Sequence, residues 1–524
     1  MSWRGPTAAI VGAIALWGCV LWLGLGAGAS RASDERVALV MTKLPPPGSP
    51  QYQAIRKRAG EVVVQPLRLT KAEAWSVPKA SAEAATKAAA AQGVEVTTLA
   101  ANWNHIFAPA PAGTAMTAEQ RAMVQRAMAS PSATAIATFL PPRAAVVEYA
   151  LTREAGAPAS IRVSLGKDTT VTISRTHVTV MADMLSWKGR VDGTGAPATL
   201  MWWPGAQMVG AIHHEGRIYS IRCMHGVLHG IVEMREDKMP PPHAPMPADL
   251  RGNDPSLRDD PLVQQGDASI LRSIVRGMHV ATAKVPGSLD KEAEKRGPQP
   301  PTPQDVVIDV IVAYTKKVAG NYTDVTRELV ELAIEESNES FRASKLGHVK
   351  LRLVHAYQTD YVEEGAHFDH LWRFADADDG YMEEIHALRD KYRADVALLI
   401  VDDAKGCGLA TRVHADADEA FAVVHQDCAA LTYSVAHEIG HLIGARHEIS
   451  MDKTLTPFAY GHGYVNGTKW RDIMSYRESC NGCQRVPVWS SPDVIIRGEA
   501  AGTADYQNNA RVIAEQAARV AAFR

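Results

Sequence analysis

Residues 437–447 read HEIGHLIGARH, and this stretch decides how the C-terminal part of the chain should fold. Four residues of an α-helix advance by about 400°, so His437 and His441 should lie on one face, one above the other. Neutral imidazoles placed in this way can bind one Zn²⁺ at about 2.0–2.1 Å. Gly444 tolerates the left-handed conformation that ends a helix, and such a turn lets His447 return as a third ligand. Three protein ligands with one open position are typical of a catalytic zinc site.

Glu438 directly follows the first histidine of this stretch. We expect it to face the open coordination position, where a carboxylate can take the proton of a zinc-activated water as general base. The alternative is an amphipathic helix whose histidines are ordinary core or surface residues. That alternative does not explain Met474, which lies downstream in the stretch DIMSY (472–476).

A long zinc signature followed by a methionine turn is the mark of the metzincin metallopeptidases, and residues 306–524 resemble them. Five more motifs occur in the order seen in bacterial reprolysin-like proteases: CGLA (407–410), AVVH (422–425), YGHGY (460–464), WRDIM (470–474) and WSSP (489–492). Among these proteases, the chain most resembles the bacterial peptidyl-Asp metalloendopeptidases. The resemblance implies one catalytic Zn²⁺, with Met474 as a hydrophobic base beneath the three imidazoles.

Some residues near the zinc signature depart from the reprolysin pattern. Glu448 stands where astacins carry Glu and reprolysins usually carry Asp, and we expect it to be a buried hydrogen-bond partner. Tyr476 resembles the tyrosine of astacins and serralysins, which implies zinc contact or oxyanion stabilisation; an ordinary packed tyrosine is the alternative. Arg477 or Arg485 could pair with acidic substrate side chains if the resemblance extends to specificity, whereas loop arginines are usually solvated.

The pattern of apolar runs predicts the fold of this region. Strands are expected at 306–312, 349–356 and 396–401, and helices after Asp324, at 382–392 and at 508–523. Alternating strands and helices indicate an α/β (α+β) metzincin-type catalytic domain with a twisted mixed sheet and a zinc-binding helix. The run 421–424 precedes the zinc helix, and its metzincin equivalent is an edge strand that pairs with extended substrate.

The N-terminus predicts export. Residues 8–26 are apolar after Arg4, and Ala-Gly-Ala at 27–29 is a cleavage signal, so we expect a signal peptide at 1–29 and a secreted or periplasmic protein. An uncleaved membrane anchor is the minority alternative, because the run is nearly long enough to span a bilayer. The net charge of −3 gives no reason to expect nucleic acid or an anionic membrane as partner.

Cysteine usage agrees with export. Cys407, Cys428, Cys480 and Cys483 are an even number inside the protease-like half and should form disulfides. We favour the pairs 407–428 and 480–483, each flanking a short segment beside the active site; a second zinc site is the rival. With Cys19 in the export segment set aside, Cys223 is left over and could bind the zinc as a latency switch, as in matrixin and reprolysin propeptides. It could instead be a buried small hydrophobe or form an intermolecular disulfide.

Residues 30–286 are interpreted as a propeptide-like region, and an independent binding domain is the alternative. Helices are expected near 71–91 and 118–129, and the alternation over 160–234 predicts a mainly β unit. A charged, Pro-rich linker at 287–305 should hold the maturation site.

The predicted function is a secreted zinc-dependent metalloendopeptidase that is made as a latent precursor, acts on protein or peptide substrates and is monomeric. The alternatives are another zinc hydrolase, such as a cell-wall amidase, and a non-catalytic zinc-binding adhesin. Other candidate metal residues are weaker. A calcium ion at Asp376, Asp378 and Asp379 lacks the EF-hand spacing and is unsupported. The pairs His213-His214 and His225/His229 lack an adjacent acid, and His462 is expected to be a loop residue.

Overall fold

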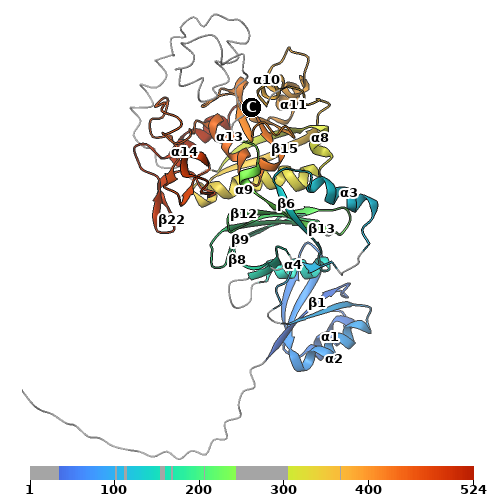
Figure 1. Ribbon diagram of the computed structural model, residues 1–524. Coiled ribbons are helices and arrows are strands. Elements are labelled where there is room, and N and C mark those ends of the chain that lie inside the picture. The colour runs from blue at the N-terminus through green and yellow to red at the C-terminus, as the bar shows by residue number, and fades with distance from the viewer. Residues whose placement is uncertain are drawn as a thin grey trace, which may run out of the picture.

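The computed structural model describes residues 35–100, 103–110, 115–153, 160–166, 169–205, 207–242, 305–365 and 367–524. The predicted signal peptide and nearly all of the linker at 287–305 lie outside these ranges. No helix within them is long and apolar enough to cross a membrane. A small α/β unit, a wide antiparallel sheet and a larger α/β unit follow one another along the chain and in space (Figure 1).

The C-terminal unit is built on a five-stranded sheet in the order β15-β14-β16-β18-β17. Four strands are parallel and the edge strand β17 runs antiparallel to β18. The strands are β14 (Val306–Tyr314), β15 (Val349–Gln358), β16 (Val396–Val401), β17 (Gly408–Ala410) and β18 (Phe421–His425). The predicted strands and mixed sheet are therefore confirmed. The expectation that 421–424 forms the edge was wrong, because the CGLA run adds a strand too short to show alternation.

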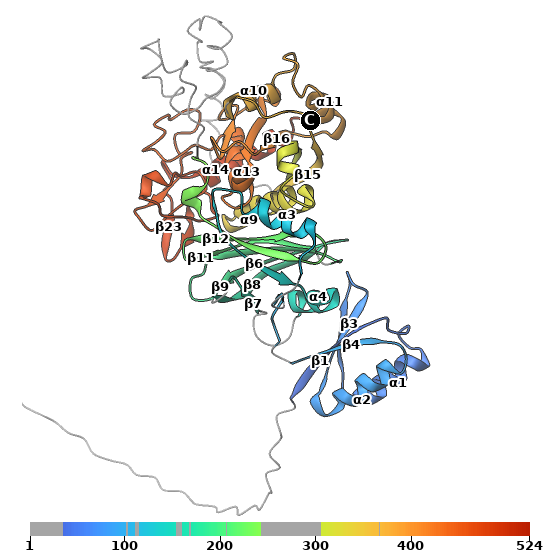
Figure 2. The same ribbon diagram turned by 45° about the vertical axis from the view of Figure 1, so that its right-hand side comes forward.

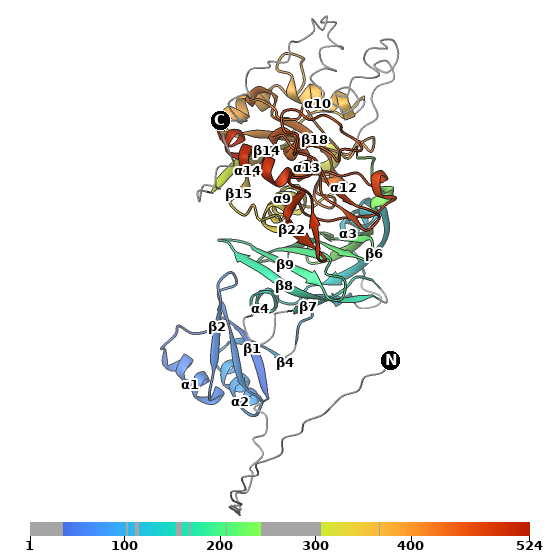
Figure 3. The ribbon, with the colours of Figure 1, turned by 90° about the vertical axis from the view of Figure 1, so that its left-hand side faces the viewer.

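Helices cover both faces of this sheet. Alternate residues of β14 point to opposite sides, so Val310 packs with one set of helices and Ile311 with the other. The first set is α9 (Glu331–Ala343), α13 (Ser434–Ile443) and α14 (Asn509–Val520), and the second is α10 (His367–Ala375) and α11 (Glu384–Tyr392). Figure 3 shows α13 and α14 beside β14 and β18. Helix α13, which carries His437 and His441, is thereby held against the sheet.

Shorter elements complete the C-terminal unit. Asp324 accepts a hydrogen bond from the backbone of Arg327 (3.1 Å), so it caps the first turn as expected. The remaining elements are α8 (Lys316–Ala319), η2 (Thr326–Val330), η3 (Ala417–Glu419), α12 (Gln426–Ala429), β19 (Val465–Asn466), β20 (Trp470–Arg471), η4 (Glu478–Cys480), β21 (Gln484–Arg485), β22 (Ser491–Ile496) and β23 (Glu499–Ala501).

A nine-stranded sheet in the order β5-β6-β13-β12-β11-β10-β9-β8-β7 forms the middle unit and confirms the predicted β region. Its strands are β5 (Ala108–Pro109), β6 (Ala133–Leu140), β7 (Ser160–Ser164), β8 (Thr170–Val180), β9 (Leu185–Val191), β10 (Pro197–Trp203), β11 (Gln207–His214), β12 (Arg217–Cys223) and β13 (His229–Met234), with η1 (Glu236–Lys238) after the last. Met201 and Val209 join the core of the C-terminal unit, whereas the other face packs on α4 (Ala144–Thr152). Figure 2 shows the sheet between α9 and α4.

The N-terminal unit has a four-stranded sheet, β2-β3-β1-β4, covered by α1 (Pro50–Ala59) and α2 (Lys79–Ala90). The strands are β1 (Arg36–Thr42), β2 (Val63–Leu67), β3 (Ala72–Pro78) and β4 (Glu95–Ala100). The helix expected at 71–91 is therefore half wrong, since its first part is β3. Trp75 and Val77 are buried on alternate positions there, and tertiary packing overrides the alanine-rich composition. The helix expected at 118–129 is confirmed as α3 (Ala118–Ala127).

Candidate active site

Helix α13 carries the first two histidines, and the turn after it returns the third. The Nε2 atom of His441 lies 3.2 Å from Nε2 of His437 and 2.8 Å from Nε2 of His447, and the third pair is 3.2 Å apart. Two nitrogens bound to one zinc ion at a tetrahedral angle are about 3.3 Å apart. Among the described residues, this is the only group of three or more His, Cys, Asp or Glu ligand atoms close enough to hold a metal ion. The donor set and its spacing fit Zn²⁺.

Backbone carbonyls orient the imidazoles. Nδ1 of His437 donates to the carbonyl of Ile473 (2.9 Å), and Nδ1 of His441 donates to the carbonyl of Ala445 (2.9 Å). A carbonyl can only accept, so the proton is on Nδ1 and the lone pair of Nε2 points to the shared centre. Burial also lowers the pKa of His441 to about 4, which keeps its ring neutral.

Two glycines allow the close packing of this helix. A Cβ on Gly440 would lie 2.5 Å from the ring of Trp489 and 3.2 Å from Sδ of Met474, so only hydrogen fits between the helix and the two side chains beneath it. Met474 is fully buried and sits under the helix, as expected for a hydrophobic base. Gly444 has a φ of 134°, which only glycine adopts without strain, and it reverses the chain toward His447.

Glu438 lies between the zinc helix and the edge strand. It is 3% exposed, and a Cβ on Gly408 would come within 2.2 Å of its Oε1. The glycine at the start of β17 therefore lets the carboxylate lie directly against the strand. Burial raises the pKa of Glu438 well above its usual value.

The sequence comparisons agree with this geometry. The model of the reprolysin-like group of metallo-peptidase family M12 matches residues 304–486. A peptidyl-Asp metalloendopeptidase of Stenotrophomonas maltophilia (strain R551-3) is 35% identical over 324 residues, which are 61% of this chain and 69% of that protein. The chain belongs to metallopeptidase family M12. It is a zinc metalloendopeptidase.

More distant relatives extend this comparison. A peptidyl-Asp metalloendopeptidase of Xanthomonas campestris pv. campestris is 33% identical over 61% of this chain and 68% of its own length. One from Pseudomonas fragi is 32% identical over 36% of this chain and its whole length. The crystal structure of metalloproteinase-II from Bacteroides fragilis covers 64% of this chain and 89% of that chain at a TM-score of 0.34 and 13% identity, which is too distant for a comparison of residues.

Tyr476 and Glu448 of the metallopeptidase both lie at the third histidine. The hydroxyl of Tyr476 is 2.7 Å from Nε2 of His447, so the structure brings this tyrosine to the triad. The carboxylate of Glu448 accepts from the backbone of Tyr476 (3.3 Å) and from the hydroxyl of Ser479. Glu448 is 4% exposed and is therefore the buried hydrogen-bond partner that the sequence predicted.

Both predicted disulfides are present. Cys407 pairs with Cys428 and Cys480 pairs with Cys483, with Cα–Cα distances of 5.5 and 5.4 Å. The first bridge links the residue before the edge strand to α12, and the second closes the loop after the methionine turn. The rival zinc site is excluded, because bridged sulfurs are not free thiolates.

The structure does not bring Cys223 to the histidine triad. Its thiol lies at the end of β12, 3.8 Å from Nε2 of His229 and 3.9 Å from the carbonyl of Met208. The residue is 2% exposed, and burial raises the pKa of its thiol. Cys223 is buried because it packs in the core of the C-terminal unit. Its burial is not due to a position opposite the three histidines.

The other histidines have ordinary partners. His229 accepts from the backbone of Met208 (3.0 Å) and donates to the carbonyl of Val227 (3.0 Å), which uses both ring nitrogens. His213 stacks on Tyr433. His462 lies outside the named helices and strands, as expected, and is fully buried, and its Nδ1 donates to the carbonyl of His447 (2.9 Å). It positions the third ligand, a role that only the fold reveals.

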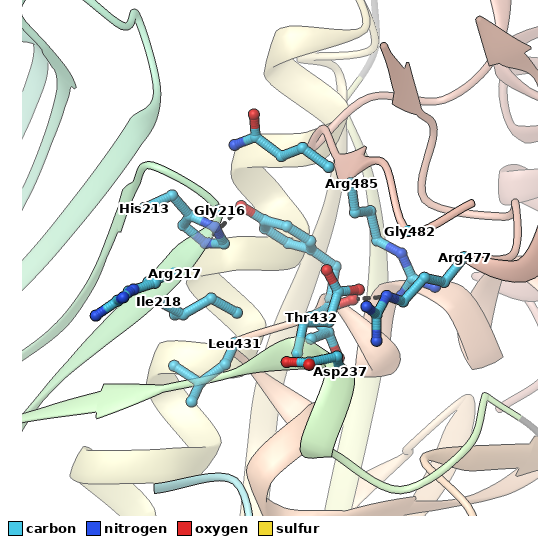
Figure 4. A pocket seen from close by; sticks show the side chains of 13 residues that line it. His213, Gly216, Arg217, Ile218, Asp237, Leu431, Thr432, Arg477, Gly482 and Arg485 are labelled. Carbon is cyan, nitrogen blue, oxygen red and sulfur yellow. Dashed lines mark hydrogen bonds between the residues drawn. The ribbon is translucent and has the colours of Figure 1, made fainter. Parts of the chain in front are cut away.

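The two arginines that the sequence suggested for binding acidic substrate side chains lie beside a cavity. A third arginine, which the sequence did not suggest, lies next to one of them. Arg477 and Arg485 line a cavity of about 90 Å³ where the C-terminal unit meets the nine-stranded sheet (Figure 4). Arg471, which the sequence analysis did not single out, lies next to Arg485 and is fully buried. The WRDIM motif, which contains Arg471, is the sequence feature that could have pointed to this residue.

Proposed function

We propose that this metalloendopeptidase is secreted as a latent precursor and cleaves peptide bonds with Glu438 as general base. The observation that carries the proposal is the placement of one buried carboxylate between a converged histidine triad and an edge strand. A binding module would not need a carboxylate at this point.

The chemistry follows from that placement. Zn²⁺ held by His437, His441 and His447 would supply Lewis acidity toward the scissile carbonyl and the attacking water. Glu438 takes the proton of that water and passes it to the leaving nitrogen. The hydroxyl of Tyr476 reaches the same centre and donates a hydrogen bond to the developing oxyanion.

The edge strand β17 orients the substrate. One side of Gly408–Ala410 pairs with β18, so its other side can bind an extended peptide by β-augmentation. Because Gly408 lies against Glu438, a peptide bound along this strand passes the general base. The relatives are named peptidyl-Asp metalloendopeptidases, and we propose a preference for peptide bonds next to aspartate here as well.

Latency and export belong to the same proposal. Residues 1–29 would direct export, the region 30–286 would keep the enzyme latent, and a cut within 287–305 would release the mature enzyme. The supporting observation is the extensive contact between the nine-stranded sheet and the catalytic unit, including a bond from the backbone of Cys223 to Glu328 (3.1 Å). Sequencing the N-terminus of the secreted product tests the cut, and an intact, fully active chain would contradict it.

Digestion of casein and of purified peptidoglycan by the secreted protein tests the reaction. We expect cleavage of casein that stops with a zinc chelator and returns with Zn²⁺. Release of muropeptides without casein cleavage would replace the proposal by a cell-wall amidase.

A further inference from the structure

Two buried arginines lie side by side at the methionine turn. Arg471 donates through Nε and Arg485 through Nη2 to the same carbonyl, that of Ser475 (3.2 and 3.3 Å). Arg471 is fully buried and Arg485 is 8% exposed. Burial and the neighbouring guanidinium of Arg485 lower the pKa of Arg471 to about 10. Two desolvated cations in contact with one carbonyl need an anion.

The other partners of the pair are mostly neutral. Arg471 also donates to the carbonyl of Cys483, and Arg485 donates to the carbonyl of Thr432 (2.7 Å). Nε of Arg485 is buried and has no hydrogen-bond partner among the described residues. The pair therefore keeps unused hydrogen-bonding capacity next to the active site.

One carboxylate is hydrogen-bonded to this pair, and it comes from the N-terminal half. Glu236, in η1 directly after the nine-stranded sheet, forms an ion pair with Nη2 of Arg471. Within the described ranges, no other carboxylate is hydrogen-bonded to either guanidinium. The neighbouring Asp237 is bound to Arg235 instead, through two hydrogen bonds of 2.9 and 2.5 Å.

The segment that carries Glu236 continues to the edge strand. Met239 is buried in one cluster with Cys407, Cys428 and Leu431. The carbonyl of Pro241 then accepts a hydrogen bond from the backbone of Cys407 (2.7 Å), the residue before β17. The segment 236–241 thus runs from the arginine pair to the strand beside Glu438, where the substrate is expected to bind.

A cavity lies at the beginning of this path. Figure 4 shows Arg477 and Arg485 entering it from the catalytic unit, and His213 and Asp237 from the N-terminal half. The lining also includes Glu236 and Thr432. An acidic side chain that entered from this direction would meet buried guanidinium donors.

We propose that Arg471 and Arg485 form the subsite for an acidic substrate side chain, and that Glu236 occupies this subsite in the precursor as a substrate mimic. The inference rests on the proposed peptidase function and extends it to the residues that select the substrate. Removal of the N-terminal region would take Glu236 away and leave the two guanidinium groups without this carboxylate partner. An aspartate of the substrate would then replace Glu236 through charge-assisted, fork-shaped hydrogen bonds.

The proposal that Glu236 occupies the subsite is tested by measuring peptide binding to the full-length chain. This chain carries Glu438→Ala, which prevents self-cleavage. The probes are two labelled peptides that differ only by one Asp or Asn, and affinity is read by fluorescence anisotropy. Adding Glu236→Gln should tighten binding of the Asp peptide at least about tenfold. The reason is that the carboxylate of Glu236 no longer competes with the aspartate of the peptide for the two arginines. Asp237→Asn is the matched control and should change the affinity less than about twofold.

The subsite is tested by cleavage of the same two peptides by the secreted enzyme with Arg485→Gln or Arg485→Lys. The ratio of kcat/KM for Asp over Asn should fall at least about tenfold with Gln, and Lys should restore part of it, since it keeps the charge without the planar fork. Circular dichroism checks that each variant is folded.

The outcomes separate the inference from the proposed function. If Glu236→Gln only lowers the melting temperature and leaves both peptide affinities unchanged, the ion pair is merely structural and the inference is overturned. An unchanged Asp-over-Asn ratio in folded Arg485→Gln overturns it as well. If the wild type cleaves neither peptide nor casein, the peptidase function fails, whereas the binding experiment still decides the subsite.

Discussion

The side chains of the proposed catalytic site are each positioned by a close contact with the backbone. The imidazoles of His437 and His441 are oriented by backbone carbonyls, and the carboxylate of Glu438 lies close against Gly408, which has no side chain. Side chains held in this way need no reorganisation when charge develops during the reaction. The roles of ligand and base can therefore be separated by single substitutions.

Glu438→Ala should keep one zinc ion per chain and lose activity by about 10²–10⁴-fold, because general acid–base groups typically contribute this much. His441→Ala should lose both the zinc and the activity, since it removes one of three ligands. Zinc content by atomic emission and hydrolysis of casein provide the two measurements. Wild-type activity in Glu438→Ala would overturn the assigned mechanism.

Gly440→Ala should destabilise the catalytic unit by about 1–3 kcal/mol, the usual cost of overpacking. The added Cβ would lie 2.5 Å from the buried ring of Trp489, which is itself held by a hydrogen bond to Ser340 (3.0 Å). Denaturant unfolding measures the change. Gly166→Ala is the control, because nothing lies within 4 Å of its Cβ. Equal stability of both variants would show that the ring moves aside freely.

At the scale of elements, short segments around the zinc helix depend on covalent and polar ties. The edge strand β17 has three residues and follows Cys407, whose bridge to Cys428 connects it to α12. The loop after the methionine turn is closed by the second bridge and by the bond from Arg471 to the carbonyl of Cys483. Such segments bury little apolar surface and need these links to stay in place.

The two disulfides should therefore contribute unequally. The bridge between Cys407 and Cys428 spans 21 residues, whereas that between Cys480 and Cys483 spans 3. Loop-closure entropy predicts losses of about 3 and about 2 kcal/mol when each pair is replaced by alanine. Guanidinium unfolding of the two double variants provides the measurement. A larger loss for the short bridge would show that native packing, and not chain entropy, dominates.

At the scale of the whole molecule, the N-terminal half covers the catalytic unit through buried polar contacts as well as a shared core. Lys188 pairs with Glu335 (3.4 Å), and Arg222 pairs with Asp427 (3.5 Å) next to the edge-strand disulfide. Both cations are nearly fully buried, so breaking either pair would leave a desolvated charge. For the proposed precursor, these contacts favour inhibition by the N-terminal half as a unit over inhibition by a single thiol.

Cys223→Ser should accordingly leave the precursor as latent as the parent chain. The thiol contacts His229 and a carbonyl of the nine-stranded sheet and is absent from the histidine group. Activity of the unprocessed precursor on a fluorogenic peptide is the measurement, with Cys223→Ala as the control for loss of polarity. A large rise in activity in both variants would restore the cysteine switch.

The local sequence was sufficient to predict helix α13, the convergence of its two histidines with His447 and the buried Met474, because these depend on helical spacing and on two glycines. It also predicted the parallel strands and the disulfide pairs, since continuous apolar runs and an even cysteine count need no knowledge of distant residues. The misread segment 71–91 and the edge strand β17 required tertiary pairing, as short strands have no periodicity of their own. The contacts of Cys223, the burial of His462 and the pairing of Arg471 with Glu236 joined residues far apart in the chain. Such contacts are decided only by the folded structure. Whether a side chain is buried, and which charge lies next to it, depends on which distant segments pack against each other.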